Sequence, residues 1–223
     1  MTGDTVLTVT DLDESNRLIS WVAIATAVMA AVSLAMAVTT LPRSGPYCRS
    51  DCVGYPYVDA AAFVPRDYLW IYPALVLWLL VVVLVQCIHS LVDPHLRMLS
   101  GVAVTFTAIG VGTLIVDYAI QLTFIQPALL LGETEGLTPW SQYNPYGIFI
   151  ALENVGYLLL NLAFLAIGVA LIRMPTKLWR IVAWILQSLV RLPWCCCCSI
   201  PPSTGFAWTT GSKSPRYSLP GSC

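Results

Sequence analysis

Four long apolar runs are the feature that most constrains the fold of this chain. A helix that crosses a membrane needs about 20 consecutive, mostly apolar residues. Runs that meet this length cover residues 18–40, 69–92, 99–125 and 146–172. Tryptophan and tyrosine, which favour the headgroup layer, lie near several of their ends. The sequence therefore predicts an all-α membrane protein, built as a bundle of four transmembrane helices, with the lipid bilayer as its main partner.

Composition argues against a soluble domain. Of the 223 residues, 57% are hydrophobic and only 10% are charged, whereas a soluble domain carries about 25% charged residues. The net charge of −1 offers no basic surface, so we expect no nucleic-acid partner. Residues 1–17 form a polar, acidic arm, unlike the positive start of a secretory signal peptide. We expect the first run to be a retained span of a multi-pass protein in the cell (plasma) membrane.

The basic residues of the connections predict an orientation. The connection that follows residue 172 carries three basic residues within ten positions, and the connection between the third and fourth runs carries none. By the positive-inside rule, the former is cytoplasmic and the latter external. The N-terminus is then cytoplasmic and the 41–68 connection external. Three arginines in that external connection oppose this assignment.

The 41–68 connection has features of its own. Cys48 and Cys52 form a candidate disulfide, which would agree with an oxidising compartment; two unpaired thiols are the alternative. The rest of the segment is too aromatic and apolar for a free linker, so we expect it to cover the membrane surface or the helix ends. Asp67 precedes the second span, where we expect it to cap the helix with Arg66 as a partner.

Two carboxyl residues lie inside spans, where each costs about 2.5–3.5 kcal/mol at the helix centre. Asp117 is in the third run and Glu153 in the fourth. These runs are joined by one external connection, so we expect them to pack as antiparallel neighbours with both carboxyls in the outer half of the membrane. Helical spacing adds companions on the same or adjacent faces, namely Gln121, Asn154, Tyr157 and Asn161.

This expected polar cluster has two interpretations. It is either a ligand or proton site, or a set of polar side chains that hold the helices together. The sequence has no phosphate-binding loop, HExxH or GxSxG motif, which favours a non-enzymatic role, and we expect no cofactor and no metal. We predict small-ligand or ion binding or transport. An intramembrane enzyme using the carboxyls as acid and base, or a structural or assembly subunit, are the alternatives, and the oligomeric state stays open.

The C-terminal part differs from the rest. Residues 173–192 contain a basic cytoplasmic loop and a weak or truncated fifth helix, and residues 193–223 form an irregular tail. Its cysteine run is a candidate lipidation site formed by Cys195, Cys196, Cys197 and Cys198. Where two cysteine codons adjoin, the triplet that begins at the third base of the first codon encodes leucine. The other interpretation is therefore a frameshift before the cysteines, with further spans in the native frame.

Several segments carry a resemblance. YPYVDAAAFVPRDYLWIYPALVL, DYAIQLTFIQPALLLGETEGL and, most specifically, SQYNPYGIFIALENVGYLLL resemble a group of small bacterial multi-pass integral membrane proteins of unknown function. The resemblance covers roughly residues 17–190. It implies a helical membrane fold that continues into further spans, and it implies no activity or catalytic residue.

Overall fold

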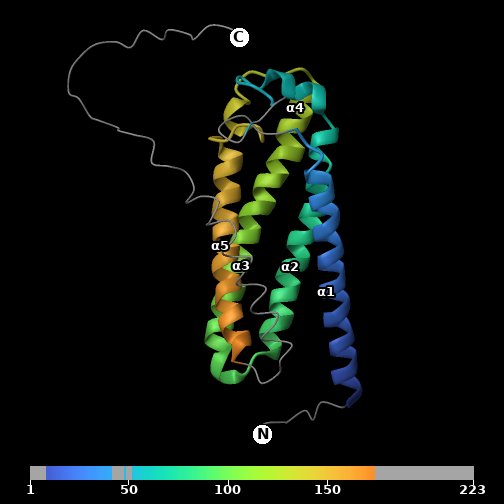
Figure 1. Ribbon diagram of the computed structural model, residues 1–223, viewed down its shortest axis with the longest axis vertical. Coiled ribbons are helices and arrows are strands. Elements are labelled where there is room, and N and C mark those ends of the chain that lie inside the picture. The colour runs from blue at the N-terminus through green and yellow to red at the C-terminus, as the bar shows by residue number, and fades with distance from the viewer. Residues whose placement is uncertain (1–8, 42–47, 49–51, 174–223) are drawn as a thin grey trace, which may run out of the picture.

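The computed structural model describes residues 9–41, 48 and 52–173. This part of the chain is helical and forms an up-down-up-down bundle of four long helices (Figure 1). They are α1 (Val9–Ala37), α2 (Ile71–Leu91), α3 (Arg97–Ile120) and α5 (Ile148–Ile172). The predicted fold class is confirmed for these four helices. The expected fifth helix and the irregular tail with its cysteine run lie outside the described residues.

All four helices are long and apolar enough to cross a membrane. The 21 residues of α2 extend about 31 Å at 1.5 Å per residue, close to the thickness of about 30 Å of a hydrocarbon core. Many large apolar side chains on the outside of the bundle are exposed, as contact with lipid requires. The chain thus has the features of an integral membrane protein.

The helix ends follow from local sequence. At the turn between α2 and α3, Val92 is extended and the Asp93 carboxylate accepts a hydrogen bond from the backbone N–H of His95. Pro94 lies in the first turn of the short helix that follows, where its missing N–H costs no hydrogen bond. At the other end of the chain, α1 begins at Val9 and so extends into the stretch expected to be a polar arm.

The third span continues beyond its expected end. A π-helical turn, η4 (Gln121–Ile125), follows α3 directly and leads into α4 (Gln126–Leu130). Pro127 lies in the first turn of α4, where its ring cannot fit a regular α-helical turn on its N-terminal side. The wider π-helical turn precedes this proline, and the helix continues to Leu130 instead of stopping at residue 125.

The bundle is held mainly by a close contact between α3 and α5, while α1 packs against α2 and α2 against α3. A Cβ atom added at Gly110 would lie only 2.9 Å from the carbonyl oxygen of Gly156, and one added at Gly156 would lie 2.6 Å from Leu114 Cγ. Small residues allow this approach, which is how membrane helices gain packing without a hydrophobic driving force.

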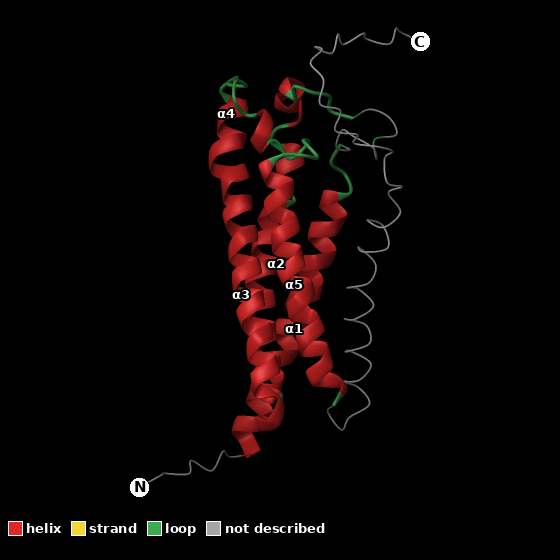
Figure 2. Cartoon of the chain, turned by 90° about the vertical axis from the view of Figure 1, so that its left-hand side faces the viewer, coloured by secondary structure: helices red, strands yellow, loops and turns green. Residues whose placement is uncertain are grey.

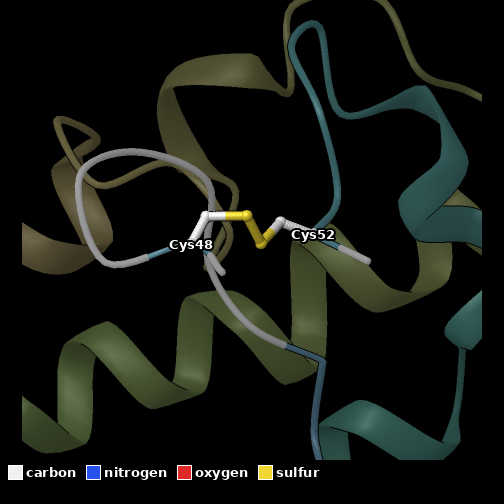
Figure 3. The surroundings of a disulfide bond; sticks show 2 residues. All are labelled: Cys48 and Cys52. Atoms are coloured by element: carbon white, nitrogen blue, oxygen red, sulfur yellow. A yellow bond between two sulfur atoms is a disulfide. The ribbon is translucent and has the colours of Figure 1, made fainter. Parts of the chain in front are cut away.

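The two long connections fold over one end of the bundle, which we call the loop end (Figure 2). We call residues 52–70 and 131–147 the cap. Three short helices form part of it, η1 (Val58–Phe63), η2 (Arg66–Tyr68) and η5 (Thr138–Trp140). The Thr138 hydroxyl donates to the Pro56 carbonyl and joins the two halves. A disulfide joins Cys48 to Cys52, the first residue of the cap (Figure 3).

Candidate functional site

A cavity of about 430 Å³ opens at the loop end. Because α1 packs against α2 and α5 against α3, space remains between the end of α1 and the start of α5. The cap closes over part of this space. The described lining residues are Ala37, Val38, Thr40, Leu41, Trp70, Gln142, Tyr143, Glu153 and Tyr157.

Glu153 is the acidic residue of this lining. It lies in the second turn of α5 and is only 6% exposed. The Tyr118 hydroxyl, on α3, donates to Glu153 Oε1 at 3.3 Å, and the Tyr157 hydroxyl lies 3.5 Å from the same oxygen. The two hydroxyls are 3.1 Å apart. The three side chains therefore form one hydrogen-bonded group that links α3 and α5 at the wall of the cavity.

Aromatic rings surround this group. Trp70 meets Tyr118 edge to face with ring centroids 5.3 Å apart, and Phe149 stacks on Tyr118 at 6.1 Å. On the other side, Trp78 of α2 lies 5.9 Å from Tyr157. Each pair adds about 0.5–1.5 kcal/mol beyond the area that it buries. The rings fix the positions of the two tyrosines that hold Glu153.

Asp67 is the second organising carboxylate, and it is completely buried. The Arg66 guanidinium Nε donates to its Oδ1 at 2.8 Å, as expected from the sequence. The Tyr143 hydroxyl donates to Oδ2 at 2.7 Å, and the backbone N–H of Leu41 donates to the same oxygen at 3.2 Å. Burial, with the hydrogen bond to this carboxylate, raises the pKa of Tyr143 above its ordinary value of about 10.

The expectation that Asp67 caps the second span was wrong. The residue before α2 is Trp70, and no side chain caps the helix there. Asp67 instead joins three parts of the loop end: the segment after α1, the residues before α2 and the connection before α5. Its backbone carbonyl also accepts a hydrogen bond from Gln142 Nε2, which fixes a second residue of the cavity wall.

The structure brings together only part of the predicted polar cluster. Glu153 and Tyr157 are hydrogen-bonded and line the cavity. Asp117 and Gln121 are buried on the third span but are not among the described lining residues. The Gln121 amide donates to the Trp140 carbonyl at 2.8 Å and so supports the cap.

The two asparagines of the predicted cluster lie elsewhere on α5. Asn154 is exposed, whereas Asn161 is half-buried two turns further from the loop end. Neither lines the cavity among the residues that the structure describes. Residues that lie next to Glu153 on a helical wheel therefore do not have to face the same neighbouring helix as Glu153.

Sequence reasoning missed the cap residues and one buried tyrosine of the third span. Tyr118 follows Asp117 directly, so the register of the α3–α5 contact decides which of the two meets Glu153. The contacts of Asp67 with Tyr143 and Gln142 join residues more than 70 positions apart, and no local pattern indicates them. The residues that the sequence did not assign to the site are Trp70, Tyr118, Gln142, Tyr143 and Asp67, the last of which was expected only as a helix cap.

No protein-family model, curated protein or solved structure matches this chain. The geometry of the cavity and of the hydrogen-bonded groups around it is therefore the basis for an inference about function.

Proposed function

We propose that this integral membrane protein binds a small ligand or ion in the loop-end cavity. The observation that carries the proposal is the cavity itself. Its wall includes a buried carboxyl residue, Glu153. An ionisable residue within a span is costly and usually marks a ligand or ion site. A volume of about 430 Å³ lies in the range of about 300–1,000 Å³ that is typical of small-molecule sites.

A purely structural role for the polar group is the main alternative. Tyr118, Tyr157 and Glu153 satisfy part of one another's hydrogen-bonding capacity, as residues that only join helices would. Such residues need no cavity beside them. The cavity therefore favours binding over a role limited to helix association.

The orientation proposed from the basic residues places the loop end outside the cell and the N-terminus in the cytoplasm of a plasma-membrane protein. The disulfide near the cap supports this assignment, because disulfides persist in oxidising compartments. The cavity would then be reached from the external side. Transport would in addition require a path toward the opposite end of the bundle.

Filling the cavity tests the binding proposal. The full chain is purified in detergent, and its thermal stability is measured against a panel of small cations, anions and neutral solutes. We expect at least one class to stabilise the wild type, and Ala37→Phe, which fills the cavity, to abolish that stabilisation. Ala35→Phe is the matched control, since Ala35 is exposed on the same helix and is not among the described lining residues. Equal responses from both variants would contradict the proposal.

Transport is tested separately in proteoliposomes loaded with the ligand class that stabilises the protein. If the carboxyls take part in transport, the double variant Asp117→Asn/Glu153→Gln should lose flux while it still purifies as a folded protein. Stabilisation without flux in the wild type would limit the function to binding.

A further inference from the structure

We infer that the ligand of the loop-end cavity is an amphiphile from the membrane, with a hydroxylated polar head and an apolar chain. This inference rests on the proposed function and specifies the class of its ligand. It follows from where the cavity opens, from the depth of that opening within the span and from the two kinds of wall that the cavity has.

The cavity opens to the side of the bundle. In Figure 1, α1 and α5 are the two outer helices with α2 and α3 between them, and the contacts between the helices follow the same order. Two lining residues are at the same time exposed on the outside of the bundle. Val38, at the end of α1, is 71% exposed, and Tyr157 of α5 is 37% exposed. The cavity therefore opens between the end of α1 and the start of α5.

Helix length places this opening within the membrane. The 25 residues of α5 extend about 37 Å, so a hydrocarbon layer of about 30 Å centred on this helix begins about 4 Å beyond its first residue. Tyr157 lies nine residues after Ile148, about 14 Å along the axis, and therefore about 10 Å inside the layer. At the level of Tyr157, the opening faces acyl chains and not water.

The wall has an apolar and a polar part. Ala37, Val38 and Leu41, at the end of α1, form the apolar part. Gln142 of the cap and Glu153 of α5 belong to the polar part. An amphiphile matches both parts, because its head can lie at the polar part while its chain lies beside α1 and continues into the acyl layer. A ligand that is polar throughout would leave the apolar part without a matching surface.

Hydroxyl groups suit the polar part because they both donate and accept hydrogen bonds. The Thr40 hydroxyl already donates to the Ala37 carbonyl, so it is an acceptor for a ligand. The amide of Gln142 has both donor and acceptor atoms. A head with several hydroxyls, such as that of a glycerol ester, can pair with both kinds of group. This match is the same for a charged and for a neutral Glu153.

The test is photolabelling of the full chain in lipid nanodiscs. The probe is a monoacylglycerol with a diazirine on the acyl chain next to the ester, and mass spectrometry locates the labelled peptides. We expect the label at the end of α1 and the start of α5. Ala37→Phe, which fills the cavity, should lower this labelling about tenfold. Ala35→Phe should keep it, since Ala35 is exposed and is not among the described lining residues.

Two competitors separate the head from the chain. Unlabelled monooleoylglycerol should displace the probe about tenfold better than methyl oleate, which has the chain without the hydroxyls, or glycerol, which has the hydroxyls without the chain. Equal displacement by methyl oleate would overturn the inference, because the head would then contribute nothing. Equal displacement by glycerol at the same total concentration would also overturn it, because the ligand would then be a water-soluble solute.

The outcomes also separate this inference from the proposed function. If the label covers the exposed faces of α2 and α3 as densely as the surroundings of the cavity, the amphiphile is excluded. Stabilisation by a soluble solute that Ala37→Phe abolishes would then still support the proposed function. If neither the probe nor any solute of the panel responds to Ala37→Phe, the proposed function fails as well. Should Ala37→Phe not fold, the position of the label in the wild type decides alone.

Discussion

Tyr143 and Tyr68 are two buried tyrosines at the loop end that differ in what their hydroxyls contact. The Tyr143 hydroxyl donates to the Asp67 carboxylate at 2.7 Å. The Tyr68 hydroxyl is buried and has no hydrogen-bond partner among the described residues. Replacing each by phenylalanine removes the same atom from a similar environment. The pair therefore compares a buried hydroxyl that is hydrogen-bonded to Asp67 with one that is not.

The expected loss can be estimated from the remaining contacts. A hydrogen bond to a charged group contributes about 1.5–3 kcal/mol. In Tyr143→Phe, Asp67 keeps Arg66 on Oδ1 and the Leu41 N–H on Oδ2, so its carboxylate stays partly satisfied. We expect a loss in the lower half of the range, about 1.5–2 kcal/mol, or roughly a ten- to thirtyfold change in the unfolding equilibrium. Tyr68→Phe should leave stability unchanged or slightly higher, because it removes an unsatisfied buried group.

The measurement is unfolding by SDS in mixed micelles, followed by circular dichroism. Neither substitution changes a tryptophan, so intrinsic fluorescence provides a second reading of the same transition. Equal losses in the two variants would refute the reasoning, because the Asp67 contact would then contribute nothing specific. A larger loss in Tyr68→Phe would refute it more strongly.

Three further predictions concern the helix contact, pH and orientation. Gly110→Ala should destabilise the bundle by about 1–3 kcal/mol through overpacking, whereas Gly112→Ala, with no atom within 4 Å of the added Cβ, should not; the same SDS titration compares them. Because the pKa of folded Tyr143 is raised, its contribution to stability is present below about pH 10 and declines at higher pH, so the alkaline loss of stability should be less steep in Tyr143→Phe. In intact cells, a membrane-impermeant maleimide should label Glu135→Cys above the wild-type level and label His95→Cys only after permeabilisation; the reverse pattern would invert the proposed orientation.

The helical architecture could be predicted from sequence because the signal is local. Each span is a continuous apolar run, and its length alone indicates a crossing of the membrane. The ends of the helices were harder to predict from the sequence. Pro127 disfavours a regular helix on its N-terminal side, but only the structure shows that a π-helical turn at Gln121–Ile125 precedes it and that the helix continues.

The candidate site could be predicted only in part, since it depends on register and on distant contacts. The cost of a buried carboxyl identified Glu153, and helical spacing identified Tyr157. The same rules gave equal weight to Asn154, which is exposed, because a sequence does not show which direction a neighbouring helix comes from. The polar contacts of the cap residues could not be predicted for another reason. They join segments that are adjacent only after the bundle has formed.

The connection through Asp67 links stability to binding. One wall of the cavity comes from the end of α1, a helix whose apolar surface is mostly exposed. The Leu41 N–H is bonded to the carboxylate that also holds Tyr143, so Asp67 positions the α1 side of the cavity against the cap without lining the cavity itself. Asp67→Asn should therefore weaken the stabilisation of the full chain by its ligand class, because it loosens the α1 wall of the cavity although Asp67 does not line that cavity. An unchanged stabilisation by the ligand in Asp67→Asn would instead mean that the position of the α1 wall does not depend on this carboxylate.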